Sequence, residues 1–343
     1  MDHEISLTEL TDDDLAAVVA LCREALDLPE DAAEATAIVA RLRDTAPIPA
    51  DPARPVGSGA APGSTARRTV GFAARSGDAL LGVVLGSVAH RDPSVGHIDL
   101  VAVHPRHRRR GVARSLLTRA EGALAGLGVG EILLADNPPY YAWPGVDVRY
   151  TPAVCAAMAL GYDHDRTAWN MTADLSDPAS PALRDTRPAR ERLAAQGVTI
   201  RSAGPEDVDA LVAFARSTFG FAWGAEVAHS VGRPGAGCHI ALRDLPSGVG
   251  DGDGDGDRAT GATEVLGFAA YGSSRPSWFG PMGTAPDAQG LGIGSVLLRR
   301  CLRDQRAAGL DRVQIGWVGP VPFYSSSAGA RIDRVFFLYR KQF

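Results

Sequence analysis

Two short segments of this chain have the residue types and the spacing needed to bind phosphate groups. One is Arg108-Arg109-Arg110-Gly111-Val112-Ala113 and the other is Gln289-Gly290-Leu291-Gly292-Ile293-Gly294. Each follows a strand-like segment that ends in proline and precedes an amphipathic, helix-like segment. The first N–H groups of a helix lack intrahelical partners and attract anions, and glycine lets the backbone approach a phosphate closely. The segments therefore predict two polyanion-binding turns.

Both segments belong to a longer repeat. Residues 105–134 align without a gap with residues 286–315 at a constant offset (286 − 105 = 181). A P-loop would need Gly-Lys-Ser/Thr, but Lys341 is the only lysine in the chain. The dinucleotide fingerprint needs a third glycine, where the two possible registers place Ser295 or Leu297. Both of these phosphate-binding loops are excluded.

The remaining pattern, Gln/Arg-x-x-Gly-x-Gly/Ala, resembles the coenzyme A pyrophosphate loop of the GNAT superfamily of N-acetyltransferases. The second copy matches it fully, and the first uses the variants Arg108 and Ala113. The resemblance implies an α/β fold, with a mixed sheet of α+β type, built as two tandem GNAT-type acyl-CoA N-acyltransferase domains. It also implies acetyl-CoA, or another acyl-CoA, as co-substrate and no metal.

The resemblance also implies which residues hold the coenzyme. In the family, the strand before the loop diverges from the next strand and binds the pantetheine arm through its exposed backbone. The residues concerned in the first copy are Val101, Ala102, Val103, Arg108, Arg109, Arg110, Gly111, Val112, Ala113 and Arg114. Those in the second copy are Met282, Gly283, Thr284, Gln289, Gly290, Leu291, Gly292, Ile293, Gly294 and Ser295.

Catalysis in such an enzyme is direct attack of an amine on a thioester, which needs a base for the ammonium and an acid for the thiolate. Family members often carry the acid as a tyrosine in a Phe-Tyr-x-x-x-Gly context. Phe323-Tyr324 is followed by Gly329, one residue beyond the usual spacing, so Tyr324 is the candidate acid. The base stays open between His97 or Asp99 in the first half and Glu226 or His229 in the second.

The aromatic segment 137–150 has no counterpart in the second half. It could bind substrate or plug the first domain against the second. Because the second copy matches the motif fully and retains the tyrosine, we expect the second domain to be catalytic. The acceptor would be a primary amine of a small molecule. Two alternatives remain open: a non-catalytic acyl-CoA-binding or regulatory protein, or acyl transfer from a carrier-protein thioester.

Length and pattern place the domain boundaries. The 343 residues suit two domains: residues 1–175 and 198–343, joined by a linker at 176–197. In each half, the sequence pattern predicts the same order of elements: strand, helix, hairpin, strand, turn, helix, strand, helix and strand. The Pro/Ala/Gly-rich segment 46–65 predicts a mobile loop. The acidic repeat 251–257 fits no EF-hand register, because no register puts both glycine at position six and glutamate at position twelve.

Composition excludes several classes of protein. The net charge of −5 argues against a nucleic-acid partner, and no apolar run approaches the length of a membrane span. The acidic start of the sequence does not resemble a signal peptide. The four cysteines stand in periodic segments without a CxxC pair, so we expect small core residues in a reducing compartment, the cytoplasm. The oligomeric state stays open.

Overall fold

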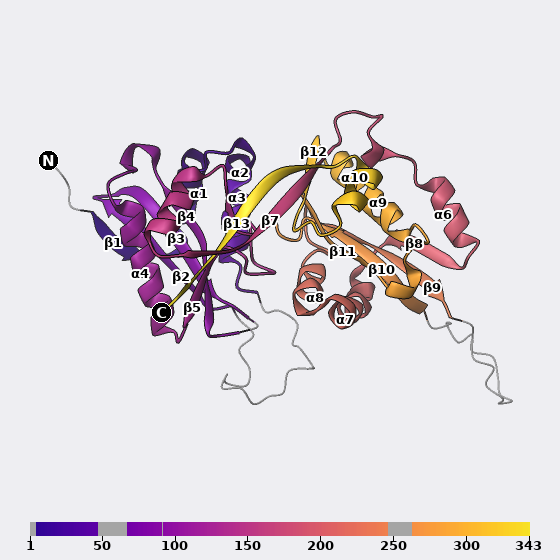
Figure 1. The fold of residues 1–343 in the computed structure, drawn as a ribbon, viewed down its shortest axis with the longest axis horizontal. Helices are drawn as coiled ribbons and strands as arrows, with labels where there is room; N and C mark the ends of the chain where they lie inside the picture. Colours follow the sequence, from indigo (N-terminus) through magenta and orange to yellow (C-terminus); the bar gives the residue numbers. More distant parts are fainter. Residues whose placement is uncertain (1–4, 47–66, 91, 246–262) are drawn as a thin grey trace. The chain divides into compact units, whose positions relative to one another are not determined.

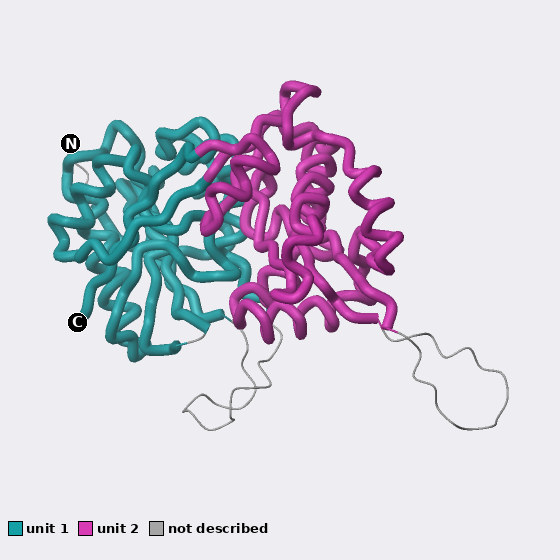
Figure 2. The backbone as a smooth tube through the Cα atoms, turned by 45° about the vertical axis from the view of Figure 1, so that its right-hand side comes forward, with its two compact units in different colours: residues 1–170, 332–343 teal, residues 171–331 magenta. Residues whose placement is uncertain are grey.

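The computed structural model describes residues 5–46, 67–90, 92–245 and 263–343 (Figure 1). The start of the chain, nearly all of the predicted mobile loop and the acidic repeat 251–257 lie outside these ranges. Two compact units are present (Figure 2). Unit 1 comprises residues 1–170 and 332–343, and unit 2 comprises residues 171–331.

Unit 1 is a mixed sheet with helices packed on its faces. Its strands follow the order β1-β2-β3-β4-β5-β13. The strands are β1 (Ser6–Glu9), β2 (Thr69–Ser76), β3 (Ala79–Val88), β4 (Val95–Val103), β5 (Glu131–Leu134), the short β6 (Val146–Asp147), the first part of β7 (Asp163–Asp174) and nearly all of β13 (Arg331–Gln342). The helices are α1 (Leu15–Ala25), α2 (Pro29–Ala33), α3 (Ala35–Arg43), α4 (Val112–Gly126) and α5 (Thr151–Ala159).

Unit 2 repeats this plan in the order β7-β12-β11-β10-β9-β8. Its strands are β8 (Val198–Ser202), β9 (Gly237–Asp244), β10 (Thr263–Tyr271), β11 (Trp278–Thr284), β12 (Arg312–Ile315) and the end of β7. Its helices are α6 (Arg187–Ala194), α7 (Val208–Phe219), α8 (Phe221–Ala228), α9 (Ile293–Ala307) and α10 (Val321–Ala328). The mixed α/β class and the tandem arrangement predicted from the sequence are confirmed.

The two halves of the sequence exchange their last strands. The end of β7, from the first half, joins the sheet of unit 2, and β13, from the second half, joins the sheet of unit 1. Residues 171–174 of β7 pair antiparallel with β12 in unit 2. Residues 340–342 of β13 pair antiparallel with β5 in unit 1. Each unit therefore contains one strand contributed by the other copy of the repeat.

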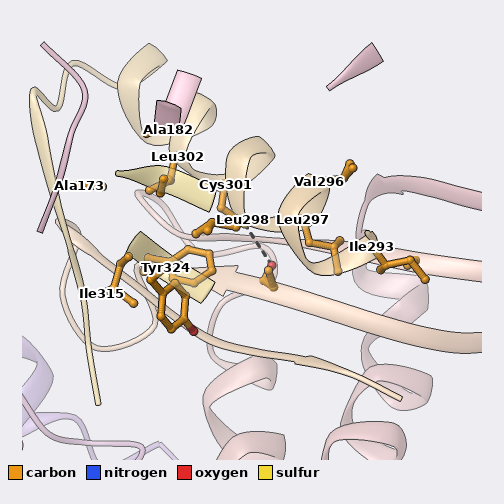
Figure 3. Close-up of a cluster of buried hydrophobic side chains, with 14 of the residues drawn as sticks. Ala173, Ala182, Ile293, Val296, Leu297, Leu298, Cys301, Leu302, Ile315 and Tyr324 are labelled. Carbon is orange, nitrogen blue, oxygen red and sulfur yellow. Dashed lines mark hydrogen bonds between the residues drawn. The ribbon is translucent and has the colours of Figure 1, made fainter. Parts of the chain in front are cut away.

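Apolar periodicity decides which faces are buried. In unit 2, Ile293, Leu297 and Cys301 of α9 pack with strand and helix residues in one core, drawn in Figure 3. In unit 1, Leu116, Leu117 and Leu124 of the equivalent helix α4 pack with strand residues in one core. The leucine pairs Leu116-Leu117 and Leu297-Leu298, at equivalent positions of the repeat, are therefore core residues of the two units.

The range 176–197, predicted as the linker, contains a 3-10 turn at Pro181–Leu183 and helix α6, whose Leu193 is buried in unit 2. One of the four cysteines differs from its prediction. Cys22, Cys238 and Cys301 are buried, but Cys155 is exposed on α5, so the prediction of a core residue is wrong there. The reason is that α5 is apolar all round and buries only one side, at Ala157.

A buried ion cluster attaches the end of the chain to unit 1. Arg334 on β13 donates to both carboxylate oxygens of Asp31, at 2.9 and 2.8 Å, and to Asp147 at 2.6 Å. All three side chains are at most 1% exposed. The carboxylates raise the pKa of Arg334 even though its burial lowers it.

Replacing Arg334 with methionine should destabilise unit 1 by about 3–5 kcal/mol, because it removes the guanidinium that compensates two buried carboxylates. Asp147 would keep its ion pair with Arg149, and Asp31 would keep its hydrogen bonds from Trp143 and Tyr150. Urea unfolding followed by hydrogen exchange of the β5 and β13 peptides measures the change. The matched control is Arg340→Met on the same strand, whose 43% exposed side chain pairs with Glu131 and Asp165. That change should cost no more than about 1 kcal/mol. Equal losses in both variants would contradict the assignment of the cluster as a structural lock.

Candidate active site

In both units a strand diverges from its parallel neighbour at the same repeat position. β4 pairs with β5 from Val95↔Glu131 to Ile98↔Leu134 and then continues to Val103. β11 pairs with β12 at Trp278↔Gln314 and Phe279↔Ile315 and continues to Thr284. The diverging segments contain all six strand residues expected to hold the pantetheine arm.

A β-bulge marks each point of divergence. In unit 1 the register skips Asp99, which lies between Ile98 and Leu100 on β4. In unit 2, Phe279 pairs with Tyr271 and Met282 pairs with Ala269. Two residues of β11 therefore lie opposite one residue of β10, and these two, Gly280 and Pro281, form the bulge. Asp99 and Gly280 occupy equivalent positions of the repeat (280 − 99 = 181). Bulges re-aim a strand and end its pairing, as is common beside active sites.

Beyond the bulge, backbone groups face the diverging side. His104 N–H donates to Leu81 at 2.9 Å, and Ala285 N–H donates to Leu266 at 2.8 Å. Because successive residues of a strand direct their backbone groups to opposite sides, Val103 and Thr284 face away from β3 and β10. In unit 1 the Val103 carbonyl accepts a hydrogen bond from Arg108 Nε at 3.2 Å.

The glycine turns begin helices as the sequence predicts. Gly111 is the N-cap of α4 with φ 82°, and Gly292 is the N-cap of α9 with φ 89°. Arg109 and Gly290, at equivalent positions, have φ 63° and 83°. A Cβ placed on Gly290 or Gly292 would meet no atom within 4 Å, so bare backbone faces open space. These turns fit the pyrophosphate of a coenzyme at the N-terminus of each helix.

The two turns differ in their side chains. Arg108 donates to the Ala25 carbonyl at 2.8 Å and pairs with Asp27 at 3.0 Å, which ties its guanidinium to the end of α1. Arg109, Arg110 and Arg114 are exposed. Gln289 is exposed at the equivalent of Arg108. The first turn is thus the more basic, but the guanidinium of Arg108 already has protein partners.

Tyr324 lies where β11 and β12 diverge. It is carried by α10 and packs edge-on against Phe279, the last paired residue of β11, with ring centroids 6.3 Å apart. Figure 3 shows it beside Ile315, the last residue of β12. Burial raises the pKa of its phenol, so the hydroxyl is protonated at neutral pH and able to donate a proton. This geometry suits the predicted acid.

The base candidates lie in different environments. Glu226 is buried on α8, and His229 caps the end of that helix. In unit 1, Asp99 Oδ2 accepts from Arg67 at 2.8 Å and from Ser87 at 2.6 Å. Burial raises the Asp99 pKa to about 6, outweighing the opposing charge of Arg67. Burial also lowers the His97 pKa to about 4, and the His97 ring bonds the Ala135 carbonyl at 2.7 Å.

The aromatic segment of unit 1 is packed in its interior. Trp143 belongs to the core formed with α1 and α3, and its indole N–H donates to Asp31 at 3.2 Å. The Tyr140 side chain is fully buried, and the backbone carbonyl of Tyr140 accepts a hydrogen bond from Arg67 at 3.3 Å. These contacts of Trp143 and Tyr140 lie within unit 1 and test neither of the two roles that the sequence left open.

Sequence reasoning did not select two features of the site. Phe219 on α7 lies against Gly283, where a Cβ would come within 2.3 Å of its ring. Arg67 joins Ser87 and Asp99 in one buried network. The aromatic density of residues 214–223 was the available signal for Phe219, whereas nothing local to Arg67 predicts its partners.

The fold and the coenzyme-type turns define an acyltransferase, and comparison with known proteins agrees. Residues 45–142 match the model of the Acetyltransferase (GNAT) family. The chain belongs to this family and is an N-acetyltransferase; the family uses an acyl-CoA co-substrate.

Two curated proteins and one solved structure are similar to this chain over most of its length. The chain is 31% identical to the mycothiol acetyltransferase of Salinispora tropica, over 67% of this chain and 68% of that protein. It is 29% identical to the mycothiol acetyltransferase of Salinispora arenicola, over 68% and 69%. A tandem GNAT protein from the clavulanic acid biosynthesis pathway matches with a TM-score of 0.60 and 17% identity, over 99% of this chain and 98% of that one. Among the described residues, no helix is long and apolar enough to cross a membrane.

The buried His97 predicts a pH dependence of stability. Its folded pKa of about 4 lies below the ordinary 6.5, so the unfolded chain binds the proton more readily. Its contribution to stability should therefore be present above pH 6.5 and be lost as the pH falls toward 4, by about 3 kcal/mol. The raised pKa of Asp99 has the opposite effect on stability, because the folded protein binds this proton more readily than the unfolded chain does.

Replacing His97 with glutamine should remove the His97 part of this slope. Urea unfolding of both proteins at intervals from pH 4 to pH 7 measures it. The same slope in both proteins would show that His97 titrates normally in the folded state.

Proposed function

We propose that this chain transfers an acyl group, most simply acetyl, from an acyl-CoA to a primary amine of a small molecule by direct attack in a ternary complex. We assign the reaction to unit 2. The observation that carries this assignment is that one unit combines the diverging β11, the glycine turn before α9 and the buried Tyr324 at the point of divergence.

Binding would use the backbone of unit 2. The N–H groups at the start of α9 would receive the pyrophosphate, with Gly290 and Gly292 allowing its close approach. Thr284 and Met282 would hold the pantetheine arm along the open side of β11. In this arrangement the thioester would lie beside Phe279 and Tyr324.

Proton transfer would use two side chains. The Tyr324 hydroxyl, which is protonated at neutral pH, would donate to the departing thiolate. Glu226, buried on α8, is our candidate for accepting the ammonium proton through water. In unit 1, the equivalent of Gly280 is Asp99, and its carboxylate is engaged by Arg67 and Ser87. We therefore propose that unit 1 is a structural partner that can still hold a coenzyme.

The acceptor is proposed to be a small-molecule amine, in line with relatives named for mycothiol acetylation. Transfer from a carrier-protein thioester and coenzyme binding without catalysis are the alternatives. A comparison of acyl donors distinguishes them. The proposed function predicts thiol release from acetyl-CoA in the presence of an amine. Carrier-protein transfer predicts activity only with carrier-protein thioesters, and coenzyme binding without catalysis predicts no thiol release at all.

Gly292→Glu should abolish coenzyme binding in unit 2 and turnover with it. A bulky anion would enter the phosphate site, and a side chain at φ 89° adds backbone strain. Calorimetric titration with coenzyme A and an assay of thiol release measure both effects. The matched control is Gly111→Glu at the equivalent position of unit 1, which should keep turnover. The reverse result, with Gly292→Glu active and Gly111→Glu inactive, would move catalysis to unit 1.

Tyr324→Phe should lower kcat about 100-fold or more while the affinity for acetyl-CoA stays unchanged, because only the proton donor is lost. Steady-state kinetics measure kcat and KM separately. Tyr339→Phe, in the core of unit 1, serves as the control and should keep full turnover. A Tyr324→Phe enzyme with normal kcat would exclude the tyrosine as the acid.

A further inference from the structure

Three arginines of unit 2 converge on one short turn. The turn is the 3-10 segment Pro181–Leu183, which lies in the range predicted as a linker. Arg184 follows the turn directly, and Arg299 and Arg303 reach it from α9. We call these three residues the arginine cluster. Positive charge is therefore concentrated at one place on unit 2.

Backbone carbonyls hold two of the guanidinium groups in place. The Nε of Arg299 donates to the Pro181 carbonyl at 3.2 Å and to the Ser327 carbonyl at 3.0 Å. Arg303 donates to the Leu183 carbonyl from Nε at 3.2 Å and from Nη2 at 2.7 Å. Such bonds fix the direction of a planar guanidinium and leave its other N–H groups available. The cluster is therefore oriented before any ligand binds.

The charges of the cluster are not neutralised by carboxylates. In the described part of the chain, no ion pair involves Arg184, Arg299 or Arg303. Asp185 lies nearby, but the backbone N–H and the guanidinium of Arg187 engage it at 2.9 Å each. Burial, and after it the charge of Arg184, lowers the pKa of Arg299. An anion bound between such like charges would relieve their repulsion.

The repeat itself does not require these arginines. With the offset of 181, the positions of unit 1 that correspond to Arg299 and Arg303 are Thr118 and Gly122 on α4. Both helices nevertheless pack their leucine pairs into a core in the same way. The basic residues of α9 are therefore not part of what the shared fold needs.

We propose that the arginine cluster binds the phosphate monoester of a small phosphorylated metabolite. A phosphate monoester carries a charge of about −2 at neutral pH and offers several acceptor oxygens, which suits arginines directed at one place. The cluster is confined to one short turn and the chain has a net charge of −5, so a compact dianion fits better than a long nucleic-acid backbone.

The cluster is separated from the site proposed for the coenzyme pyrophosphate. Arg299 follows Gly292, the N-cap of α9, by seven residues (299 − 292 = 7). That spacing corresponds to about 10 Å along a helix. Binding at the cluster does not depend on the reaction proposed for unit 2, and it can be measured without turnover.

Isothermal titration calorimetry of the full chain with glucose 6-phosphate tests the site. Saturating coenzyme A is present throughout, so that both glycine turns are filled. Glucose 6-phosphate should bind at neutral pH. Glucose, which is uncharged, and glucose 6-sulfate, which carries a single charge, should bind about tenfold more weakly or not at all. No binding of glucose 6-phosphate, or equal binding of all three compounds, would overturn the proposal.

Single substitutions locate the binding. Arg184 is exposed and has no side-chain partner among the described residues, so Arg184→Gln should leave the fold intact and weaken glucose 6-phosphate about tenfold, as expected for loss of a charge-assisted hydrogen bond. Arg303→Gln should weaken it similarly. Arg306→Gln is the matched control, because it removes a charge from the same helix but one that pairs with Asp311. It should change the affinity by less than about twofold. Equal losses in the three variants would indicate general attraction by positive charge and overturn the site.

Two further titrations separate other sources of phosphate. If the cluster received the 3′-phosphate of coenzyme A, Arg184→Gln would weaken coenzyme A and leave 3′-dephospho-coenzyme A unchanged. If it received nucleic acid, a single-stranded RNA oligonucleotide would bind far more tightly than glucose 6-phosphate and lose affinity steeply with added salt. Either result would overturn a small phosphorylated metabolite as the ligand. Unchanged affinity for coenzyme A, together with RNA binding no tighter than that of glucose 6-phosphate, would support it.

Discussion

The structure of both units depends on the point at which a parallel strand pair comes apart. A bulge at Asp99 or at Gly280–Pro281 lengthens one strand locally, and pairing with the next strand ends there. Backbone groups beyond this point no longer have a strand partner on that side, which is costly unless another group satisfies them. The helix that follows begins with a glycine turn whose N–H groups are also without intrahelical partners. In the proposed complex, the amides of a coenzyme would pair with the strand backbone and its phosphates with the N–H groups of the turn.

The two units share this constraint and differ in how they meet it. In unit 1 the bulge residue is a buried aspartate tied to Arg67 and Ser87, and the Val103 carbonyl is bonded to Arg108. The segment around Trp143 packs in the interior of the same unit. In unit 2 the bulge contains glycine and proline, and Tyr324 packs beside it. These differences, more than the shared repeat, support a single catalytic unit.

The sequence predicted the parts of the fold that depend on local patterns. The duplicated turn, its helices and the strands before it appear where the repeat and the apolar periodicity indicate, because each requires only neighbouring residues. The exchange of last strands did not follow from the sequence, since the pairing of residues 340–342 with β5 joins segments about two hundred residues apart. The exposure of Cys155 was missed because α5 lacks an apolar stripe that would reveal its buried side.

The candidate site was predictable to a similar extent. The motif led to Gly292 and Tyr324 through short spacings, but the contact of Phe219 with Gly283 depends on how α7 packs on β11. The most direct test of the account is a crystal structure of the intact chain with acetyl-CoA. We predict coenzyme at the turn before α9, with the Tyr324 hydroxyl within about 3.5 Å of the sulfur. Coenzyme bound only before α4, with Tyr324 turned away from β11, would contradict it.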